Sequence, residues 1–170
     1  KDSEGPFDLA VALDLLPIMA SHGMNTLIVD IEDGVEYKSH PEMKRHYSVP
    51  VEQMRILADA ARGLGREVVP KLNWSKSGRN LHDMWMRPHW DHVSWLKDMD
   101  EYYAVAKDVI TELTEVMEPA RFFHIGMDED HYRSVEQYVD AIETLRAMVA
   151  GLGLRAIVWN DSCHWMKTKI

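Results

Sequence analysis

Three consecutive carboxyl side chains in the second half of the chain could perform acid–base chemistry. Asp128, Glu129 and Asp130 follow Gly126, which comes directly after a short apolar run, residues 122–125. Such a run predicts a short buried strand, and the glycine allows the backbone to turn after it. Carboxylates between a buried strand and a following helix occupy the position at which barrel enzymes place their catalytic groups. The same charges could equally interact with the N-terminus of that helix, so spacing alone leaves both interpretations open.

The elements that must position these groups alternate along the chain. Apolar periodicity and the placement of glycine and proline predict four pairs, each a helix followed by a strand. The expected helices are 7–22, 50–65, 102–117 and 134–150, and the expected strands are 25–31, 67–72, 122–125 and 154–159. Alternation of this kind indicates parallel β/α units. Ser134 and Gln137 form a capping box that starts the last helix.

All four expected helices carry apolar residues at helical spacing, which predicts the side that packs on the core. They are Phe7, Val11, Leu15, Ile18 and Met19 in the first helix, Val51, Met54, Leu57, Ala58, Ala61 and Leu64 in the second, Tyr102, Ala106, Val109, Ile110, Leu113, Val116 and Met117 in the third, and Val135, Val139, Ile142, Leu145 and Val149 in the fourth. Between the first strand and the second helix, residues 35–47 are polar and contain Pro41, so irregular structure is expected there.

Polar residues come directly after every expected strand. They are Asp30 to Asp33, Asn73, Asp128 to Asp130, and Asn160 with Asp161. This repeated placement is typical of the catalytic face of a (β/α)8 TIM barrel, an α/β fold. An open doubly wound sheet is the alternative, but no glycine-rich phosphate loop follows any strand. Because a complete barrel needs about 250 residues, we expect residues 1–170 to form part of one such domain, about half of the barrel.

Composition narrows the function classes. The chain has 170 residues, of which 46% are hydrophobic and 28% charged, as expected for one globular core. The formal net charge of -9 gives no electrostatic support for binding nucleic acid or an anionic membrane. No apolar run has the length of a membrane span, and no targeting segment is visible, so the compartment stays open. The single cysteine, Cys163, allows neither an internal disulfide nor a cysteine-based zinc site.

A long segment without clear periodicity, residues 73–98, follows the second expected strand. It contains Trp74, Trp85, Trp90 and Trp95 together with three histidines. Loops of this length inside compact domains are usually functional, so we expect the segment to line a substrate pocket. The alternative is a lid that only packs its own aromatic side chains.

The sequence around the three carboxylates resembles the catalytic barrel of glycoside hydrolase family 20, the β-N-acetylhexosaminidases. That family typically carries His-x-Gly-Gly-Asp-Glu at the end of its fourth barrel strand. This chain has the same pattern from His124 to Glu129, except for Met127 in place of the second glycine. Further similar stretches are Met24 to Leu27 with Asp33, His40 to Glu42, Ala58 to Pro70, and Trp159. In order, they resemble the second to fifth barrel strands and cover nearly the whole chain.

The chain also departs from the family pattern. Ile28 and Asp30 stand where the family's second strand usually carries histidines. Residues 70–73 are Pro-Lys-Leu-Asn, where the family usually has Pro-Glu-hydrophobic-Asp followed by Pro-Gly-His. Asn160 replaces the acidic residue after the fifth-strand tryptophan, with Asp161 next. These departures concern the identity of the sugar more than the class of reaction.

The resemblance implies an enzyme that removes N-acetylhexosamine residues from glycans by a retaining, substrate-assisted hydrolysis. In that mechanism the 2-acetamido oxygen of the sugar attacks the anomeric carbon, an exception to the usual carboxylate nucleophile. Glu129 would be the general acid and then the base, and Asp128 would orient and polarise the acetamido N–H. Repulsion between adjacent carboxyl groups favours the protonated form that an acid catalyst needs. Because adjacent residues on a regular strand point to opposite faces, both can reach the sugar only if the backbone bends over residues 127–129.

Six further residues are expected to contact or surround the sugar: Asp33, His124, Trp159, Asn160, Asp161 and Trp74. Most of them have an equally simple structural alternative. His124 could orient a neighbouring group, Trp159 could fill the core, and the polar residues could satisfy turns. Asp130 is expected to be a solvated or capping charge. No cofactor and no metal are expected.

Three other functions stay open at this point. The first is a retaining glycosidase that acts on a sugar without an acetamido group. The second is a non-catalytic carbohydrate-binding relative. The third is a metal-dependent barrel hydrolase, whose ligands would come from Asp30, Glu32, His89, His92, His124, Asp128 and His131. The expected partner is a carbohydrate, with no role for nucleic acid or membrane, and the oligomeric state is left open.

Overall fold

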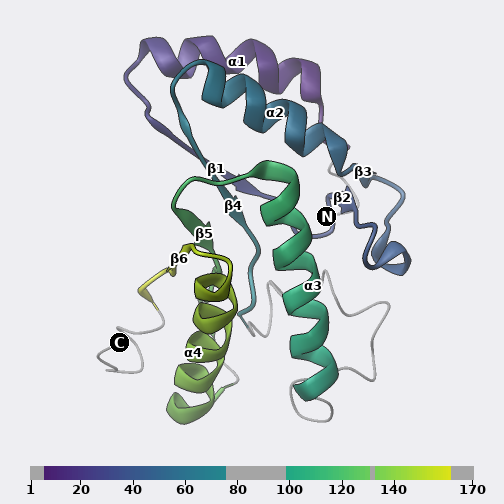
Figure 1. Cartoon of the computed structure of the whole chain (residues 1–170), viewed down its shortest axis with the longest axis vertical. Coiled ribbons are helices and arrows are strands. Elements are labelled where there is room, and N and C mark those ends of the chain that lie inside the picture. The colour runs from purple at the N-terminus through teal and green to yellow at the C-terminus, as the bar shows by residue number, and fades with distance from the viewer. Residues whose placement is uncertain (1–5, 76–98, 131–132, 162–170) are drawn as a thin grey trace.

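The computed structural model describes residues 6–75, 99–130 and 133–161 of the chain. Its main elements alternate between helix and strand, as the sequence predicts (Figure 1). They are α1 (Leu9–Ser21), β1 (Thr26–Asp30), α2 (Glu52–Gly63), β4 (Glu67–Lys71), α3 (Met99–Met117), β5 (Phe122–His124), α4 (Val135–Gly151) and β6 (Arg155–Ile157). No helix in these three ranges is long and apolar enough to cross a membrane.

The segment between β1 and α2 is more regular than expected. Two short strands, β2 (Val35–Glu36) and β3 (Val49–Pro50), pair in parallel, and the 3-10 helix η1 (Pro41–Met43) lies between them. The valines at the paired positions 35 and 49 are buried, so a local apolar contact stabilises a pairing that the mainly polar sequence does not signal. The Glu112 carboxylate on α3 accepts hydrogen bonds from the backbone N–H groups of Lys38 and Ser39 over 2.7 and 2.8 Å, which ties this segment to the helix layer.

Strands β1, β4, β5 and β6 form one parallel sheet in that order. In the register of this sheet, Asp30 lies opposite Lys71, and Lys71 lies opposite His124. Backbone hydrogen bonds extend the pairing beyond the strand ends, as from the N–H of Trp159 to the carbonyl of Gly126 over 2.9 Å. The carboxyl ends of the four strands therefore meet at one edge, as predicted, and bring together polar residues that are far apart in the sequence.

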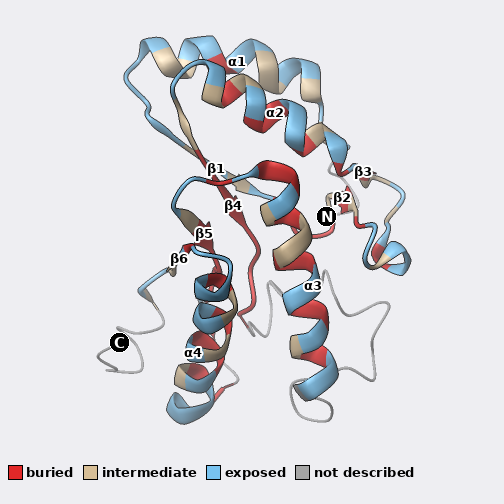
Figure 2. Cartoon of the chain, in the orientation of Figure 1, coloured by how far each residue is buried: buried red, intermediate tan, exposed pale blue. Residues whose placement is uncertain are grey.

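The helices cover one face of the sheet, because consecutive parallel strands that are also neighbours are joined by right-handed crossovers on the same side. Helix α1 packs on α2, α2 on α3 and α3 on α4 (Figure 1). Side chains alternate between the two faces of a strand. Val68 and Leu72 join the core under the helices, whereas Lys71 and Asn73 belong to the opposite face. Figure 2 shows the buried residues along β4 and β5 and on the inner sides of the helices.

Three of the residues predicted to form the core-facing side of the first helix are exposed, so this prediction is largely wrong. Val11, Leu15 and Ile18 are 53%, 47% and 54% exposed, and the buried residue of α1 is Leu16. The cause is composition. Helix α1 is apolar around almost its whole circumference, with Asp14 as its one charged residue, so periodicity cannot choose between its faces.

The predicted core side of α3 is confirmed, and the predictions for α2 and α4 are confirmed except at the helix ends and at Val139, which is half-buried. The buried positions include Met54, Leu57, Ala58 and Ala61 of α2 and Ile142, Leu145 and Val149 of α4. Leu64 and Val135 are exposed, because the first lies just beyond α2 and the second lies in the first turn of α4. The capping box is confirmed: Gln137 N donates to Ser134 Oγ over 3.3 Å, and Ser134 N donates to Gln137 Oε1 over 2.8 Å.

Candidate active site

Asn73 and Asp128 join the carboxyl ends of β4 and β5. The side-chain amide of Asn73 donates from Nδ2 to Oδ1 of Asp128 over 2.6 Å. Its oxygen accepts hydrogen bonds from the backbone N–H groups of Ser75 and Met127, each over 3.1 Å. Asn73 is buried, so these three hydrogen bonds hold the Asp128 carboxyl group at a defined place on the edge of the sheet.

Gly126 allows this close approach of the two strand ends. A Cβ atom at its position would lie 2.3 Å from Oδ1 of Asn73, closer than any packed pair of atoms tolerates. Its φ of +69° also lies in the left-handed region, where glycine is not penalised but other residues are. Both the backbone conformation and the neighbouring amide therefore require a glycine here.

The backbone bend expected over residues 127–129 is present. Met127 and Glu129 have φ values of +72° and +50°, which are uncommon for residues other than glycine. The hydroxyl of Tyr138 on α4 donates to the Met127 carbonyl over 2.8 Å, and the Met127 side chain is buried. These two contacts hold the strained residue. The bend breaks the strand alternation that would otherwise send adjacent carboxyl groups to opposite faces.

Glu129 is held through its backbone by the next strand. Its N–H donates to Oδ2 of Asp161, beyond the end of β6, over 2.8 Å. The Glu129 side chain is exposed, Asp128 is half-buried, and Asn160 is exposed. The two central carboxyl residues are therefore anchored from both sides, Asp128 by the β4 segment and Glu129 by the β6 segment.

His124, the last residue of β5, is buried beside the ring of Trp159. The two ring centroids are 4.7 Å apart, and Trp159 is 44% exposed. The backbone N–H of Gly126 donates to Nδ1 of His124 over 2.9 Å, so the proton of the neutral ring lies on Nε2. Burial, together with the cation of Lys71, lowers the pKa of His124 to about 4, although two nearby carboxylates oppose the shift. The ring is therefore a neutral hydrogen-bond donor near neutral pH.

An ion pair lies next to His124 in the same register row. Nζ of Lys71 is 2.5 Å from Oδ2 of Asp30, with side chains 9% and 55% exposed. The carboxylate places an opposite charge beside the buried ammonium group, as a buried cation needs. In the family that the chain resembles, the first of these strands usually carries histidine and the second glutamate. In this chain the first strand carries the acidic residue and the second the basic one, so the two types have changed places.

Two predicted binding residues have contacts of another kind. Asp33, in the turn after β1, accepts a hydrogen bond from the Tyr47 hydroxyl over 2.8 Å and lies 3.3 Å from Nε of Arg45. Trp74 is buried and packs edge-on against Tyr102 of α3, with ring centroids 6.0 Å apart. These are the contacts of a turn residue and of a core residue. A part in substrate binding stays a prediction for both.

The prediction that Asp130 is a solvated or helix-capping charge is wrong. Its side chain is fully buried, and Oδ2 lies 2.5 Å from Nη1 of Arg133. Its Oδ1 accepts a hydrogen bond from the Arg133 backbone N–H over 3.1 Å. Arg133 precedes α4, whose N-cap is Ser134, so Asp130 does not cap this helix. A buried carboxylate needs a partner of opposite charge, and the arginine three residues later provides it.

Several residues considered for the site lie outside the described ranges. They are Trp85, Trp90, Trp95, His89, His92 and His131. Within residues 6–75, 99–130 and 133–161, no three His, Cys, Asp or Glu side chains are grouped closely enough to hold a metal ion. No observation on the described residues therefore favours the metal-dependent alternative.

Three residues lie at the site although no sugar contact was predicted for them: Asn73, Lys71 and Asp30. The expected topology could have indicated their position. Asn73 follows one predicted strand directly, as the carboxylates follow the next, and neighbouring parallel strands end at the same edge. The three residues are also departures from the family pattern, and all three lie on adjoining strand ends.

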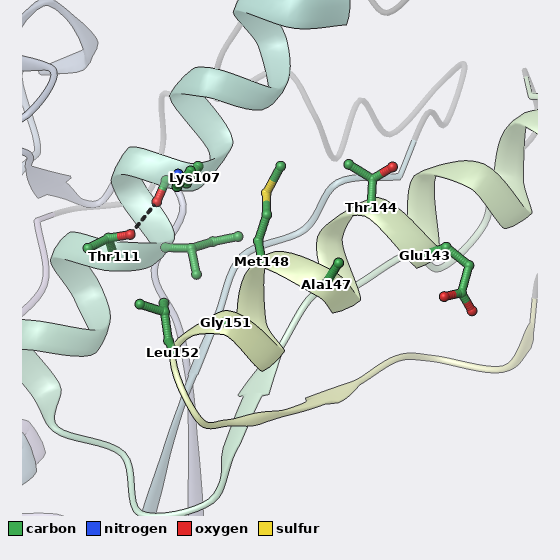
Figure 3. A pocket seen from close by; sticks show the side chains of 9 residues that line it. Lys107, Thr111, Glu143, Thr144, Ala147, Met148, Gly151 and Leu152 are labelled. Carbon is green, nitrogen blue, oxygen red and sulfur yellow. Dashed lines mark hydrogen bonds between the residues drawn. The ribbon is translucent and has the colours of Figure 1, made fainter.

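A hollow of about 770 Å³ lies on another part of the molecule, between α3 and α4 (Figure 3). Its lining is mostly apolar and consists of Lys107, Ile110, Thr111, Glu143, Thr144, Ala147, Met148, Gly151 and Leu152. These residues belong to the helix layer, on the other side of the sheet from Lys71 and Asn73. With one carboxylate in its lining, the hollow does not offer the paired acid groups of the strand ends.

The fold is similar to that of known glycoside hydrolases. The family 20 β-N-acetylhexosaminidase from Streptomyces coelicolor A3(2) matches with a TM-score of 0.79 and 17% identity over 96% of this chain and 38% of that chain. The Streptomyces plicatus N-acetyl-β-hexosaminidase in complex with Thio-NAglucal matches with a TM-score of 0.78 and 18% identity over 95% and 38%. The family 20 exo-β-N-acetylglucosaminidase from Vibrio harveyi, in complex with N-acetylglucosamine, gives 0.68 and 16% over 96% and 35%.

These similarities confirm the predicted fold: the chain forms part of a TIM barrel of the kind found in glycoside hydrolase family 20. It spans about two fifths of the length of the proteins it matches. At 16–18% identity the similarity is one of fold. No protein-family profile matches the chain, and no curated protein is similar enough in sequence to match it.

Proposed function

We propose that the protein is a glycoside hydrolase that removes N-acetylhexosamine residues from glycans by a retaining, substrate-assisted mechanism. The fold supports this class of enzyme, but a barrel fold alone hosts many activities. The proposal is carried by one arrangement at the strand ends. Asp128 and Glu129 are adjacent carboxyl residues on a bent backbone, and the neighbouring strands hold one by its side chain and the other by its N–H.

In the first step Asp128 accepts a hydrogen bond from the N–H of the sugar's 2-acetamido group. This contact directs the acetamido oxygen to the anomeric carbon, where it forms a new C–O bond as the glycosidic C–O bond breaks. Glu129 gives its proton to the departing glycosidic oxygen. The positive charge then lies on an oxazolinium-like ring, and the Asp128 carboxylate stabilises it electrostatically.

In the second step water attacks the anomeric carbon from the side that the leaving group vacated. Glu129, now a carboxylate, accepts the proton of that water, which restores the starting state. The bond between the anomeric carbon and the acetamido oxygen breaks, and its electron pair returns to the acetamido group. Two inversions at the same carbon give net retention.

The residues around the pair have roles in binding the sugar. The exposed ring of Trp159 forms an apolar wall for a sugar face. Nε2 of His124 is a buried donor without a partner among the described residues, and a substrate oxygen would satisfy it. Asn160 is exposed at the same edge and can contact sugar hydroxyls. Asp33, Asp161 and Trp74 are proposed to line the same site, and each also has the protein contacts given above.

The test is hydrolysis of a panel of aryl glycosides by the full-length protein. The panel contains the N-acetylglucosaminide, N-acetylgalactosaminide, glucoside and galactoside, and each is assayed with wild type and with Glu129→Gln. We expect turnover of the N-acetyl sugars only, and loss of that turnover in Glu129→Gln, because the variant has no proton to give.

The other outcomes separate the alternatives. Turnover of the glucoside or galactoside would overturn the substrate-assisted mechanism and leave a conventional retaining glycosidase. Sugar binding without turnover in either protein would overturn the enzyme assignment and favour a carbohydrate-binding relative.

A further inference from the structure

We propose that Asn73 is a positioning residue for the reaction: its amide orients the Asp128 carboxylate, and the role requires a hydrogen-bond donor at this position. The role rests on the proposed function. The family that the chain resembles usually has an acidic residue at this place, so the amide is a feature of this chain.

The orientation of the Asn73 amide is fixed by its own hydrogen bonds. Its oxygen accepts from the backbone N–H groups of Ser75 and Met127, and only an oxygen can accept there. The NH2 group must therefore be the end that faces Oδ1 of Asp128, 2.6 Å away. The usual ambiguity between the two ends of a side-chain amide does not arise.

The amide also has no room to move. Asn73 is buried, and its side-chain oxygen lies so close to Gly126 that a single added methyl group there would collide with it. The two backbone donors come from different strand ends, one from the β4 segment and one from the bend after β5. A shift of the amide would break both bonds, so the direction of the Asp128 carboxyl group follows from the sheet itself.

A carboxyl group at position 73 would act differently from the amide. One of its oxygens could still accept the two backbone hydrogen bonds, but the other would face Oδ1 of Asp128 at hydrogen-bond distance. Two carboxylates this close cannot both be ionised, so they share a proton. The amide removes this need, because it donates a hydrogen bond to Oδ1 of Asp128 and carries no ionisable proton of its own.

The test compares Asn73→Asp and Asn73→Ala with wild type as a function of pH. Asn73→Ala loses the donor altogether, so kcat should fall by about 10- to 100-fold with a smaller change in KM, as expected when a catalytic group is misplaced. The ratio of kcat in this variant to kcat in wild type should not depend on pH. For Asn73→Asp the ratio should be highest at low pH, where the pair keeps its shared proton, and should fall as pH rises and that proton is lost.

Two controls separate positioning from packing. Asn25→Asp places the same change on an exposed residue at the amino end of β1, and its activity ratio should be flat with pH. Asn73→Asp combined with Asp128→Asn restores a donor–acceptor pair with reversed polarity. This double variant should recover most of the thermal stability lost in Asn73→Asp but none of the activity, because the acceptor for the acetamido N–H is gone.

The outcomes distinguish this role from the proposed function. If wild type hydrolyses the N-acetyl substrates but Asn73→Ala keeps its kcat within twofold, or Asn73→Asp shows a flat ratio, the positioning role is overturned and the function stands. If wild type hydrolyses nothing, the function fails, and the pH dependence of the unfolding midpoint decides whether the amide holds Asp128. A midpoint difference between wild type and Asn73→Asp that grows with pH supports the contact, and a constant difference overturns it.

Discussion

The backbone N–H of Glu129 donates to the carboxylate of Asp161 over 2.8 Å, although the two residues are 32 positions apart in the sequence. Glu129 has a φ of +50°, a conformation that an isolated glutamate rarely adopts. The end of β6 therefore stabilises the backbone of the residue to which we assign acid catalysis. Asp161 acts here as a hydrogen-bond acceptor for the backbone, a role distinct from the sugar contact predicted for it.

Two replacements of Asp161 should distinguish the effect of its hydrogen-bond acceptor from the effect of its charge. Asp161→Ala removes the acceptor and should lower kcat by about tenfold, because Glu129 loses its anchor. Asp161→Asn keeps an oxygen that can accept the same hydrogen bond and should stay within a few-fold of wild type. Steady-state kinetics of both variants on an aryl N-acetylglucosaminide give the comparison. Equal activity of Asp161→Ala and wild type would contradict the anchoring role.

Gly126→Ala should destabilise the protein strongly. The added Cβ would lie 2.3 Å from Oδ1 of Asn73, and the left-handed φ adds strain, so we expect a loss of about 3 kcal/mol or more in the free energy of unfolding. Gly23→Ala is the matched control, because Gly23 has a φ of +79° and no atom within 4 Å of the added Cβ. Its loss should be only about 1 kcal/mol. Denaturant unfolding of the two variants measures the difference, and similar losses would show that Asn73 does not crowd Gly126.

At Met127 the glycine variant should be more stable than the alanine variant, the reverse of the usual order. Both replacements remove a buried side chain, but only glycine relieves the strain of a φ of +72°. We therefore expect Met127→Gly to be more stable than Met127→Ala by about 1 kcal/mol. At Met54, a buried position inside α2, the usual order should hold, with glycine less stable than alanine by about 1 kcal/mol. Thermal or denaturant unfolding of the four variants checks both orders, and the same order at the two sites would speak against strain at Met127.

The ionisation of His124 should respond to the ion pair beside it. Burial and the Lys71 cation lower the pKa of this ring to about 4. Lys71→Met should raise the pKa, because the repelling cation is removed, and Asp30→Asn should lower it further. The ring proton signals of His124, followed by NMR from pH 3 to pH 8, report each value. Shifts of the same sign in the two variants would contradict the electrostatic cause.

The same pKa shift has a consequence for stability. The folded ring binds its proton only below about pH 4, whereas an unfolded histidine binds one below about pH 6.5. The contribution of His124 to stability is therefore fully present above about pH 6.5 and is lost as the pH falls towards 4. Replacement of His124 by glutamine should flatten the pH dependence of the unfolding free energy in this window. An unchanged slope would mean that the ring does not titrate as described.

Local sequence signals were sufficient for the four helices and for the four strands of the main sheet, but not for the short pair β2 and β3. The capping box at Ser134 and the apolar run of β5 each lie within a few residues, and both predict the element that the structure contains. The buried side of α1 could not be predicted, because the helix is apolar nearly all round and its packing is decided by α2. When a helix is apolar all round, the periodicity of its sequence does not indicate which side will be buried.

The sequence predicts the two central carboxyl residues of the candidate site but not the hydrogen bonds and ion pairs around them. Asp128 and Glu129 are adjacent in a recognisable motif, so their place at a strand end follows from the sequence. The hydrogen bond from Asn73 depends on the register of β4 against β5, which connects residues 55 positions apart. The ion pair of Asp130 with Arg133 is local in sequence, but it could not be predicted because the sequence does not show that both side chains are buried. Contacts of this kind need the packed sheet before they can be seen.

The most direct test of the proposed mechanism is a series of aryl 2-acetamido glycosides whose acetyl group carries zero, one, two or three fluorine atoms. Fluorine makes the acetamido oxygen a weaker nucleophile without changing the carboxyl groups of the protein. If that oxygen attacks the anomeric carbon, kcat/KM should fall steeply with each added fluorine, and Asp128→Asn should slow every member of the series. A kcat/KM that stays constant across the series would contradict participation of the acetamido group and remove the central role assigned to Asp128.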